Sequence, residues 1–223
     1  MTHSFQRARS TQAKEQREND ILQAARSLAA EHGIRTITLT EIAKAIGMHK
    51  SALLRYFETR EQIFLVLAGE GWREWSAAFR ADLVEIDTVD PRSVAGIFAR
   101  TLVARPLFCD LLAHVPLNLE RNVSVERVRA FKLIALEEVA AIATELERRL
   151  HLSRSQAVNI VSTAVSMAGA MWQMATPGPE MAQLYREDPL LAHAVVDVEP
   201  RLTHILSGLI AGYLGHNRDH DMM

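Results

Sequence analysis

The chain has 223 residues, of which 48% are hydrophobic and 23% are charged, and its one cysteine is Cys109. This length can bury the core of one large or two small domains, and a lone cysteine excludes an internal disulfide. No apolar run approaches the roughly 20 residues that cross a bilayer, and the N-terminus lacks the apolar core of a signal peptide. We therefore expect a cytoplasmic protein that does not enter a membrane.

The charge of the chain is unevenly distributed. Residues 1–60 hold ten Lys and Arg and six Asp and Glu, a net charge of +4, whereas the rest holds 15 and 21, a net charge of −6. A basic segment attracts polyanions, so the asymmetry favours a nucleic acid as partner of the N-terminal part. A chance fluctuation explains this difference equally well.

Helical periodicity dominates the chain and strand signals are nearly absent, which predicts an all-α fold. Residues 1–10 are polar and expected to fray. A first helix is expected from about Thr11 to His32, with Gly33 as its left-handed C-terminal stop. A second helix begins after Thr38, which has the spacing of a capping box with Glu41. It ends at Gly47, and a third helix is expected over about residues 50–56.

A body of roughly six helices follows. Its first helix is expected to start at Thr59, to pause near Gly69 and Gly71 and to end near Ile86, and the next to start at Asp90 and Pro91. Breaks are expected at Pro106 and Pro116, followed by helices over 124–150 and 153–175. A loop with at most a short helix is expected over 177–199, then a last helix from Pro200 and a disordered polar tail from His216.

Residues 38–57 carry the most specific signal, because they combine two short helices with a glycine turn. Ile42 and Ala43 are expected to point inward, and Gly47 supplies the positive φ of the turn. The helix that follows Gly47, over about residues 50–56, is left with a cationic, hydroxyl-bearing and aromatic surface, which suits the major groove of DNA. An ordinary helical hairpin explains the cap and the turn, but not the Leu-x-x-Tyr-Phe-x-x-Arg-Glu continuation from Leu53.

This segment resembles the DNA-binding domain of the tetracycline-repressor-like (TetR) family. The residues that stand in register with the family pattern are Thr38, Ile42, Ala43, Gly47, Leu53, Tyr56, Phe57 and Glu61. Met48 and Arg60 are conservative variants at a valine and a lysine position, and residues 21–33 resemble the first helix of the family. Three positions depart from the pattern, namely His49, Ser51 and Leu54, the last of which replaces a tyrosine that usually contacts phosphate.

The resemblance implies two domains: a helix-turn-helix DNA-binding domain over residues 11–65, with a recognition helix over about 50–56, and a regulatory and dimerisation domain over 66–215. Lysine and arginine donate to guanine edges or phosphates, and a hydroxyl at a helix N-terminus favours phosphate. The residues expected to contact DNA are Thr38, Thr40, His49, Lys50, Ser51, Ala52, Leu54, Arg55, Tyr56 and Arg60.

The segment from Ser153 to Ala175 is apolar almost all round, so it is expected to be buried on two sides. One side suits its own chain and the other a partner subunit, and in the resembling family two C-terminal helices of each chain form the dimer interface. A central helix of a monomer is the alternative. The residues expected at the interface are Ile160, Ala164, Ala168, Leu206, Leu209 and Tyr213.

A ligand cavity in the body is a weaker expectation, because aromatic residues at helical spacing also form plain core. Small-molecule sites combine apolar walls with a few polar groups. The candidate lining residues are Trp72, Trp75, Phe98, Phe108, Cys109, His114, Phe131, Met171 and Trp172. Asp110 and His114 have the spacing to share a metal, but no third ligand is evident, so no metal and no cofactor are expected.

No motif of a known enzyme class stands out: there is no glycine-rich phosphate loop, no Gly-x-Ser-x-Gly and no His-Glu-x-x-His. We therefore expect a homodimeric repressor that binds a palindromic double-stranded operator and is released by a small-molecule effector. The alternatives are a helical-bundle enzyme and an interaction protein whose helix-turn-helix no longer reads DNA.

Overall fold

The computed structural model describes residues 2–86 and 88–221, with side-chain surroundings for residues 12–86, 88–191 and 194–215. The described residues contain helices and no strand, which confirms the all-α prediction. The elements are α1 (Thr2–His32), α2 (Leu39–Ala45), α3 (Lys50–Leu53), α4 (Arg60–Glu85), α5 (Pro91–Val103), α6 (Pro106–His114), a π-helical turn (Val115–Leu119), α7 (Val125–Leu150), α8 (Arg154–Ala175), α9 (Pro179–Glu187), a 3-10 helix (Pro189–Ala194) and α10 (Val198–Asp221).

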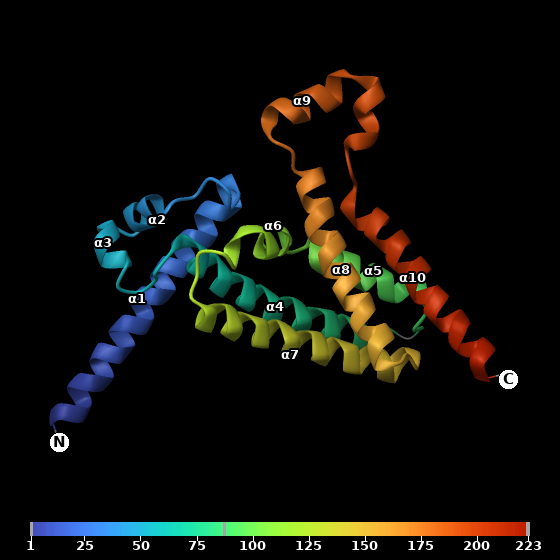
Figure 1. Ribbon diagram of the computed structural model, residues 1–223, viewed down its shortest axis with the longest axis horizontal. Helices are drawn as coiled ribbons and strands as arrows, with labels where there is room; N and C mark the ends of the chain where they lie inside the picture. The colour runs from blue at the N-terminus through green and yellow to red at the C-terminus, as the bar shows by residue number, and fades with distance from the viewer. Residues whose placement is uncertain (1, 87, 222–223) are drawn as a thin grey trace.

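Helices α1, α2 and α3 form a small unit at one end of the molecule, called the head below (Figure 1). Its core is made of fully buried apolar side chains, among them Ile21, Ala25, Ile42 and Leu53. Burial of large apolar side chains such as Ile and Leu stabilises a small unit by about 1.5–3 kcal/mol each. The head is therefore a packed scaffold that presents the short helix α3 at the surface.

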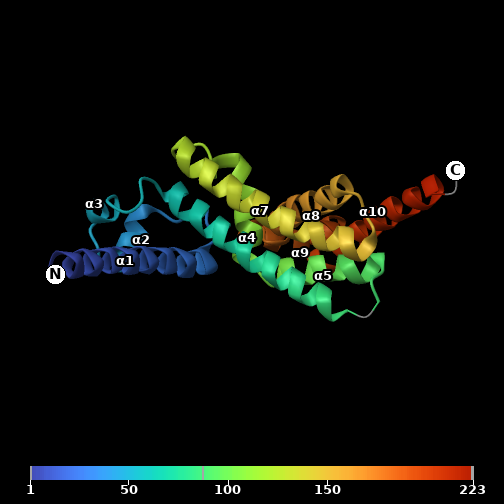
Figure 2. The same ribbon diagram turned by 90° about the horizontal axis from the view of Figure 1, so that it is seen from below.

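Helices α4–α10 form the larger body, and α4 runs from the head into it (Figure 2). Within the body α4 lies along α7, α8 packs on α6 and α7, and α10 packs on α5 and α8. Trp75 is at the centre of an aromatic cluster with Phe79, Phe98 and Phe108, at ring-centroid distances of about 6 Å. Its indole N–H donates to Thr101 Oγ1 at 3.1 Å, so its buried polar group is satisfied.

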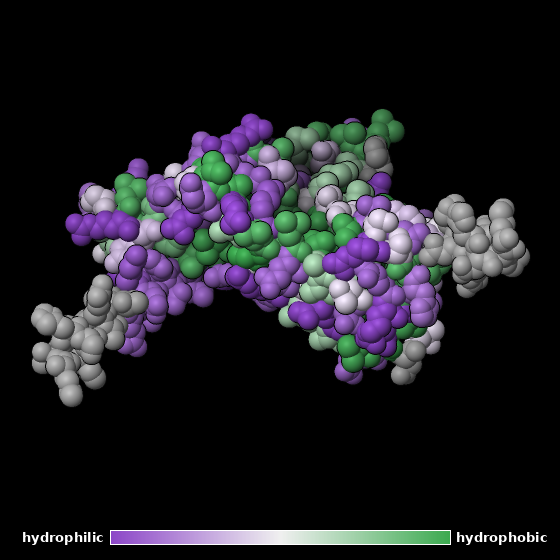
Figure 3. Space-filling view, turned by 60° about the horizontal axis from the view of Figure 1, so that its bottom comes forward, coloured by the Kyte–Doolittle hydropathy of each residue, from purple (hydrophilic) through white to green (hydrophobic). Residues whose placement is uncertain are grey.

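The termini lie at opposite ends of the molecule (Figure 1). On the face shown in Figure 3, hydrophilic residues prevail at the left, where the head lies, and hydrophobic ones cover much of the middle. Several large apolar side chains of α7 are exposed, including Leu133 and Leu136.

Helix α4 is continuous, so the predicted pause near Gly69 and Gly71 is wrong. These glycines mark places where another helix comes close. A Cβ at Gly71 would collide with the Phe108 ring, and one at Gly69 would lie 3.2 Å from Ile134 Cδ1. The missing side chains let α6 and α7 pack on α4, and this contact outweighs the low helix propensity of glycine.

Other boundaries also differ from the sequence predictions. Helix α1 begins at Thr2, not near residue 11, and α10 begins before Pro200 and continues to Asp221, into the segment expected to be disordered; residues 222 and 223 lie outside the described part. The break predicted at Pro106 is confirmed, because Pro106 opens α6, where its missing N–H costs nothing. Pro116 lies within the π-helical turn that follows. The segment 177–199, expected as a loop with at most a short helix, contains the short helix α9 and also the 3-10 helix.

Candidate DNA-binding site

The second helix of the head begins with a complete capping box. Thr38 Oγ1 accepts the Glu41 N–H, and the Glu41 carboxylate accepts the Thr38 N–H at 2.7 Å and its hydroxyl at 2.8 Å. These hydrogen bonds favour the ionised carboxylate and hold the pKa of Glu41 below its usual value. Thr38 is exposed, but its hydroxyl is engaged in the cap, which ranks it below the free side chains as a DNA contact.

A tight turn connects α2 to α3. Gly47 has φ +64°, in the left-handed region that glycine adopts without strain, and Met48 N–H donates to Ala43 O at 2.8 Å. Leu53 and Phe57 are buried and anchor the far side of α3 to the head. The turn and these anchors fix the direction in which α3 leaves the head.

His49 is the N-cap of α3, a role that the sequence pattern did not reveal. Its Nδ1 accepts the Ser51 N–H at 3.4 Å and lies 2.8 Å from Ser51 Oγ. A helix start leaves N–H groups without intrahelical acceptors, and Ser, Thr, Asp or Asn usually satisfies them. Here an imidazole replaces the usual hydroxyl, so His49 has a local structural reason for its place.

The regular helix α3 ends at Leu53, and a tighter turn carries the chain to Phe57 through bonds such as Tyr56 N–H to Leu53 O at 2.9 Å. The recognition segment is therefore shorter as an α-helix than the predicted range of residues 50–56. Leu54 and Arg55 still follow α3 directly, and both are exposed.

The exposed surface of the recognition segment is basic. Its exposed residues include five of those expected at DNA: His49, Lys50, Ser51, Leu54 and Arg55. Thr40 and Lys44 on α2 are exposed too, and Lys44 is a cation that the sequence reading did not single out. Ala52 and Tyr56 are half-buried. The arrangement offers ammonium, guanidinium and hydroxyl donors on a projecting turn, which are the groups that bind phosphates and base edges.

The side chain of Arg60, which was also expected at DNA, makes contacts within the protein. Its Nη2 donates to Ile34 O at 2.8 Å, and its guanidinium carbon lies 5.4 Å from the centroid of the Phe64 ring. The side chain is half-buried, at 23% exposure. It binds the first residues of α4 to the loop after α1.

The backbone of Ile34 is a junction between head and body. Its N–H donates to Asp110 Oδ2 of α6 at 3.0 Å, while its carbonyl accepts from Arg60. The other Asp110 oxygen accepts Gln173 Nε2 of α8 at 2.8 Å. One carboxylate thus connects the head to two helices of the body. The sequence suggests Asp110 only as half of a metal pair, and its true partners are 63 and 76 positions away in sequence.

Two further contacts hold the head in place. Arg26 Nη2 of α1 lies 2.6 Å from Glu70 Oε2 of α4, and Glu58 N–H donates to Gln62 Oε1 at 2.7 Å. Both acceptors are on α4, so this helix receives the head at several points along its first turns. The head is therefore bound to both α4 and α6 of the body.

His114 lies beside this junction. It is buried, its Nε2 is 3.8 Å from Asp110 Oδ1, and neither ring nitrogen has a hydrogen-bond partner among the described residues. Burial lowers the pKa of His114, the carboxylate of Asp110 opposes that shift, and Arg35 and Arg60 add to it. Among the described residues no group of three His, Cys, Asp or Glu is placed to hold a metal.

Cys109 is buried, and its Sγ donates to Leu102 O at 3.2 Å. Burial, together with the nearby Asp110, raises the pKa of the thiol to about 12. The thiolate is the reactive form, so this cysteine is held in its unreactive state.

Most residues expected around a ligand belong to the packed interior. Those that are buried are Trp72, Trp75, Phe98, Phe108, Cys109, His114, Phe131 and Met171, while Trp172 is half-buried. Two of them line pockets. Phe108 lines one of about 180 Å³ between α1, α4 and α6, and Phe131 lines one of about 140 Å³ between α4 and α7.

Four of the six residues expected at a dimer interface are fully buried within the protomer itself: Ile160, Ala164, Ala168 and Leu206. They offer no surface to a partner, and their assignment is corrected. The reason is that α8 packs these residues against α5, α6, α7 and α10 of its own chain; a Cβ at Gly169 would lie 2.8 Å from Ala113 N of α6. Leu209 and Tyr213 are half-buried and remain accessible.

Within the described part of the chain, no helix has the length and apolar character needed to cross a bilayer.

Two family models together cover most of the chain. Bacterial regulatory proteins of the tetR family match residues 21–67, and the tetracyclin repressor-like C-terminal domain matches residues 70–217. No curated protein matches the sequence.

Solved structures share the fold at low sequence identity. A possible TetR family transcriptional regulator from Streptomyces coelicolor A3(2) has a TM-score of 0.60 and 16% identity, over 87% of this chain and 97% of that chain. The fatty acid degradation regulator FadR from Bacillus halodurans has a TM-score of 0.51 and 16% identity, over 85% of this chain and 97% of that chain. The ketosteroid transcriptional regulator KstR2 of Mycobacterium tuberculosis has a TM-score of 0.51 and 17% identity, over 88% of this chain and 94% of that chain.

The match of both family models agrees with the exposed, basic helix-turn-helix and with the helical body behind it. The chain belongs to the TetR family of bacterial regulatory proteins and is a DNA-binding transcriptional regulator.

Proposed function

We propose that this protein is a repressor that binds a palindromic operator as a homodimer in the cytoplasm and leaves it when a small molecule binds the body. The observation that carries the proposal is the capped, basic recognition segment that projects from a packed head. Lys50 and Arg55 would donate to base edges or phosphates, and Ser51, Thr40 and Lys44 would bind the flanking phosphates of the DNA backbone. The exposed Leu54 would contact an apolar base edge.

A dimer follows from the small size of this reading surface, because one short helix specifies few base pairs. Two heads about 34–36 Å apart read half-sites on one face of DNA. The proposed interface is the outer face of α8 and α10, which are joined by Asn159 Nδ2 to Tyr213 Oη at 3.3 Å. Gly208 and Gly212 of α10 support this choice, because no atom of the same protomer lies within 4 Å of a Cβ built there.

The proposed route from effector to DNA runs through the junction at Ile34. Asp110 connects that residue to α6 and α8, and Arg60 connects it to α4. An effector that binds one arrangement of these helices better than another shifts the position of the head. The effector must bind the released arrangement better than the DNA-bound one for the protein to act as proposed.

Substitution of Lys50 tests the DNA-binding part. Lys50→Ala should weaken binding to the preferred duplex by about 1–3 kcal/mol while it changes binding to unrelated duplex little. Wild-type affinity should also fall steeply with salt, since phosphate contacts release counterions. Binding that is insensitive both to salt and to Lys50→Ala would contradict the proposal. The control is Arg129→Ala, which removes an exposed arginine of α7.

A further inference from the structure

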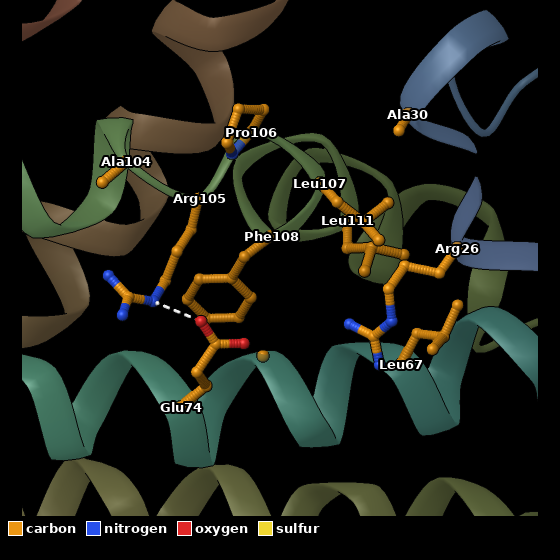
Figure 4. Close-up of a pocket in the computed structure, with 11 residues that line it drawn as sticks. Arg26, Ala30, Leu67, Glu74, Ala104, Arg105, Pro106, Leu107, Phe108 and Leu111 are labelled. Atoms are coloured by element: carbon orange, nitrogen blue, oxygen red, sulfur yellow. Dashed lines mark ion pairs between the residues drawn. The ribbon is translucent and has the colours of Figure 1, made fainter. Parts of the chain in front are cut away.

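We propose that the pocket between α1, α4 and α6 binds a small apolar carboxylic acid, with Arg26 as the group that holds the carboxylate. The inference rests on the proposed function only in that it makes this acid the effector. The pocket is drawn in Figure 4 and has a volume of about 180 Å³. A cavity of about 150 Å³ holds a molecule the size of benzene, so an acid of about six to eight carbons fits.

The walls of the pocket are mostly apolar. Leu67 comes from α4, and Leu107, Phe108 and Leu111 come from α6, with Ala30 of α1 on the head side (Figure 4). Gly71 forms part of the floor, and the Phe108 ring packs directly on it. Small-molecule sites have this composition: apolar walls that exclude water, with a few polar groups at defined places.

Arg26 supplies the polar group. Its Nη2 pairs with Glu70 at 2.6 Å, but its Nε is buried and has no hydrogen-bond partner among the described residues. A buried donor without an acceptor is unfavourable, so a ligand that offers an acceptor to it gains stability. A carboxylate is the best match, since it accepts from a guanidinium through charge-assisted bonds.

Arg105 at the other end of the pocket strengthens the preference for an anion. Its Nε lies 3.1 Å from Glu74 Oε1, and this ion pair flanks the Phe108 ring in Figure 4. Glu74 is 61% exposed and lines the same pocket beside Arg105. The pocket thus has a guanidinium on both sides of an apolar centre.

The position of the pocket between head and body explains how a bound ligand would change the affinity for DNA. Arg26 and Ala30 belong to the head, and the other walls belong to the body. A ligand that fills the space fixes one separation of α1 from α6. Because linkage is reciprocal, an acid that prefers this separation changes DNA affinity by the factor by which DNA changes acid affinity, commonly about 5–150-fold.

Titration of the full-length protein with hexanoate tests the site without DNA. The Trp72 ring lies 5.7 Å from the Phe108 ring, so tryptophan fluorescence reports on this wall. Hexanoate should give a saturable change, whereas 1-hexanol should bind at least about tenfold more weakly because it lacks the charge. Hexylamine, whose ammonium group would face Arg26, should also bind more weakly than hexanoate.

Two variants and a control separate the site from the rest of the molecule. Arg26→Gln removes the guanidinium and should weaken hexanoate about tenfold to hundredfold. Ala30→Leu fills the pocket from the head and should weaken it without removing any charge. Arg73→Gln, an exposed arginine of α4 outside this pocket, should leave hexanoate binding unchanged.

The outcomes distinguish the site from the function. If the protein binds its preferred DNA but hexylamine binds better than hexanoate, or if hexanoate binds both variants as well as wild type, the proposed site is wrong. The same holds if no probe gives a saturable change. If hexanoate binds as expected but no DNA is bound, the site stands and the proposed function fails.

Discussion

His49 illustrates how a departure from a family pattern acquires a physical meaning once its neighbours are known. The sequence shows only that a histidine stands where a small hydroxyl residue is usual. The structure gives it the same task, because Nδ1 accepts the Ser51 N–H and contacts the Ser51 hydroxyl. The imidazole performs this task only in its neutral form, with Nδ1 unprotonated.

Replacement of His49 should show this role in the free energy of unfolding. His49→Ala removes the cap acceptor and should lower the stability by about 0.5–2 kcal/mol, whereas His49→Ser supplies a common cap and should lower it less. Denaturant unfolding followed by circular dichroism measures both. Equal stability of His49→Ala and wild type would mean that the cap contributes nothing.

His114 should make the stability depend on pH. Burial lowers the pKa of His114 from an ordinary value of 6.5, so the unfolded chain binds a proton more readily than the folded one. The contribution of His114 is therefore complete above pH 6.5 and is lost as the pH falls below it. Unfolding free energies measured from about pH 7.5 down to about pH 5.5 should decrease, and less so in His114→Gln.

The same change at the exposed His204 is the control for that measurement. A decrease in stability that is as steep in His114→Gln as in wild type would show that other groups are responsible. Because His114 adjoins Asp110, the acid-induced loss should also affect the junction with the head.

At the scale of elements, local signals in the sequence were sufficient for most helix starts. Thr38 with Glu41, Thr59, Asp90 with Pro91, and Ser153 all cap helices as expected. These signals are local because the capping side chain and the N–H that it accepts are two or three residues apart. The errors arose where a contact from a distant helix decides, as at Gly71, whose low propensity is overridden by Phe108.

The head–body junction lay beyond sequence reasoning for the same reason. Nothing near Asp110 in sequence indicates that its carboxylate meets Ile34 and Gln173. Arg60 was expected at the DNA because an arginine at this lysine position can bind phosphate, and the sequence did not indicate that its guanidinium donates to Ile34 O. Spacing identified the reading surface but not the contacts that hold it.

Asp110→Asn should loosen this junction. The amide has one acceptor oxygen, so its NH2 group must face either the Ile34 N–H or the Gln173 NH2, and one donor is left without an acceptor. The expected loss of stability is about 1–3 kcal/mol, with faster hydrogen exchange at the Ile34 amide.

A second change provides the rescue for Asp110→Asn. Adding Gln173→Glu in the same chain gives the new side-chain NH2 group at position 110 an acceptor, and the amide oxygen can then accept from Ile34. The double variant should therefore regain stability and slow exchange, and Glu137→Gln on exposed α7 should have no effect. If the double variant is no better than Asp110→Asn, the carboxylate does not act through these two partners.

At the scale of the whole molecule, the sequence distinguished an apolar helix but not which of its sides were already occupied. Burial on all sides by the same chain and burial against a partner give the same apolar pattern. The helices around α8 use the residues that were assigned to a dimer, and the accessible surface of α8 and α10 carries small residues instead. Aromatic residues expected around a ligand were likewise used as core.

Gly212→Glu tests the proposed dimer surface. A glutamate in a helix is more favourable than glycine, and no atom of the protomer lies within 4 Å of its Cβ, so the fold should not lose stability. A charge in the interface should nevertheless give a monomer at micromolar concentration, measured by light scattering, with weaker DNA binding. Gly96→Glu, where the Cβ is equally free, should stay dimeric; dimers of both variants would place the interface elsewhere.

Operator recognition by α3 is tested most directly by selection of bound duplexes from a random pool with the full-length protein. Paired recognition segments predict an enriched palindrome whose half-site centres are separated by about one helical turn, roughly 10–10.5 base pairs, or a multiple of it. Lys50→Ala should relax the enriched sequence at the base pairs that this side chain contacts, while the protein remains folded. Enrichment of no sequence, or of the same sequence by Lys50→Ala, would contradict the claim that α3 reads operator DNA.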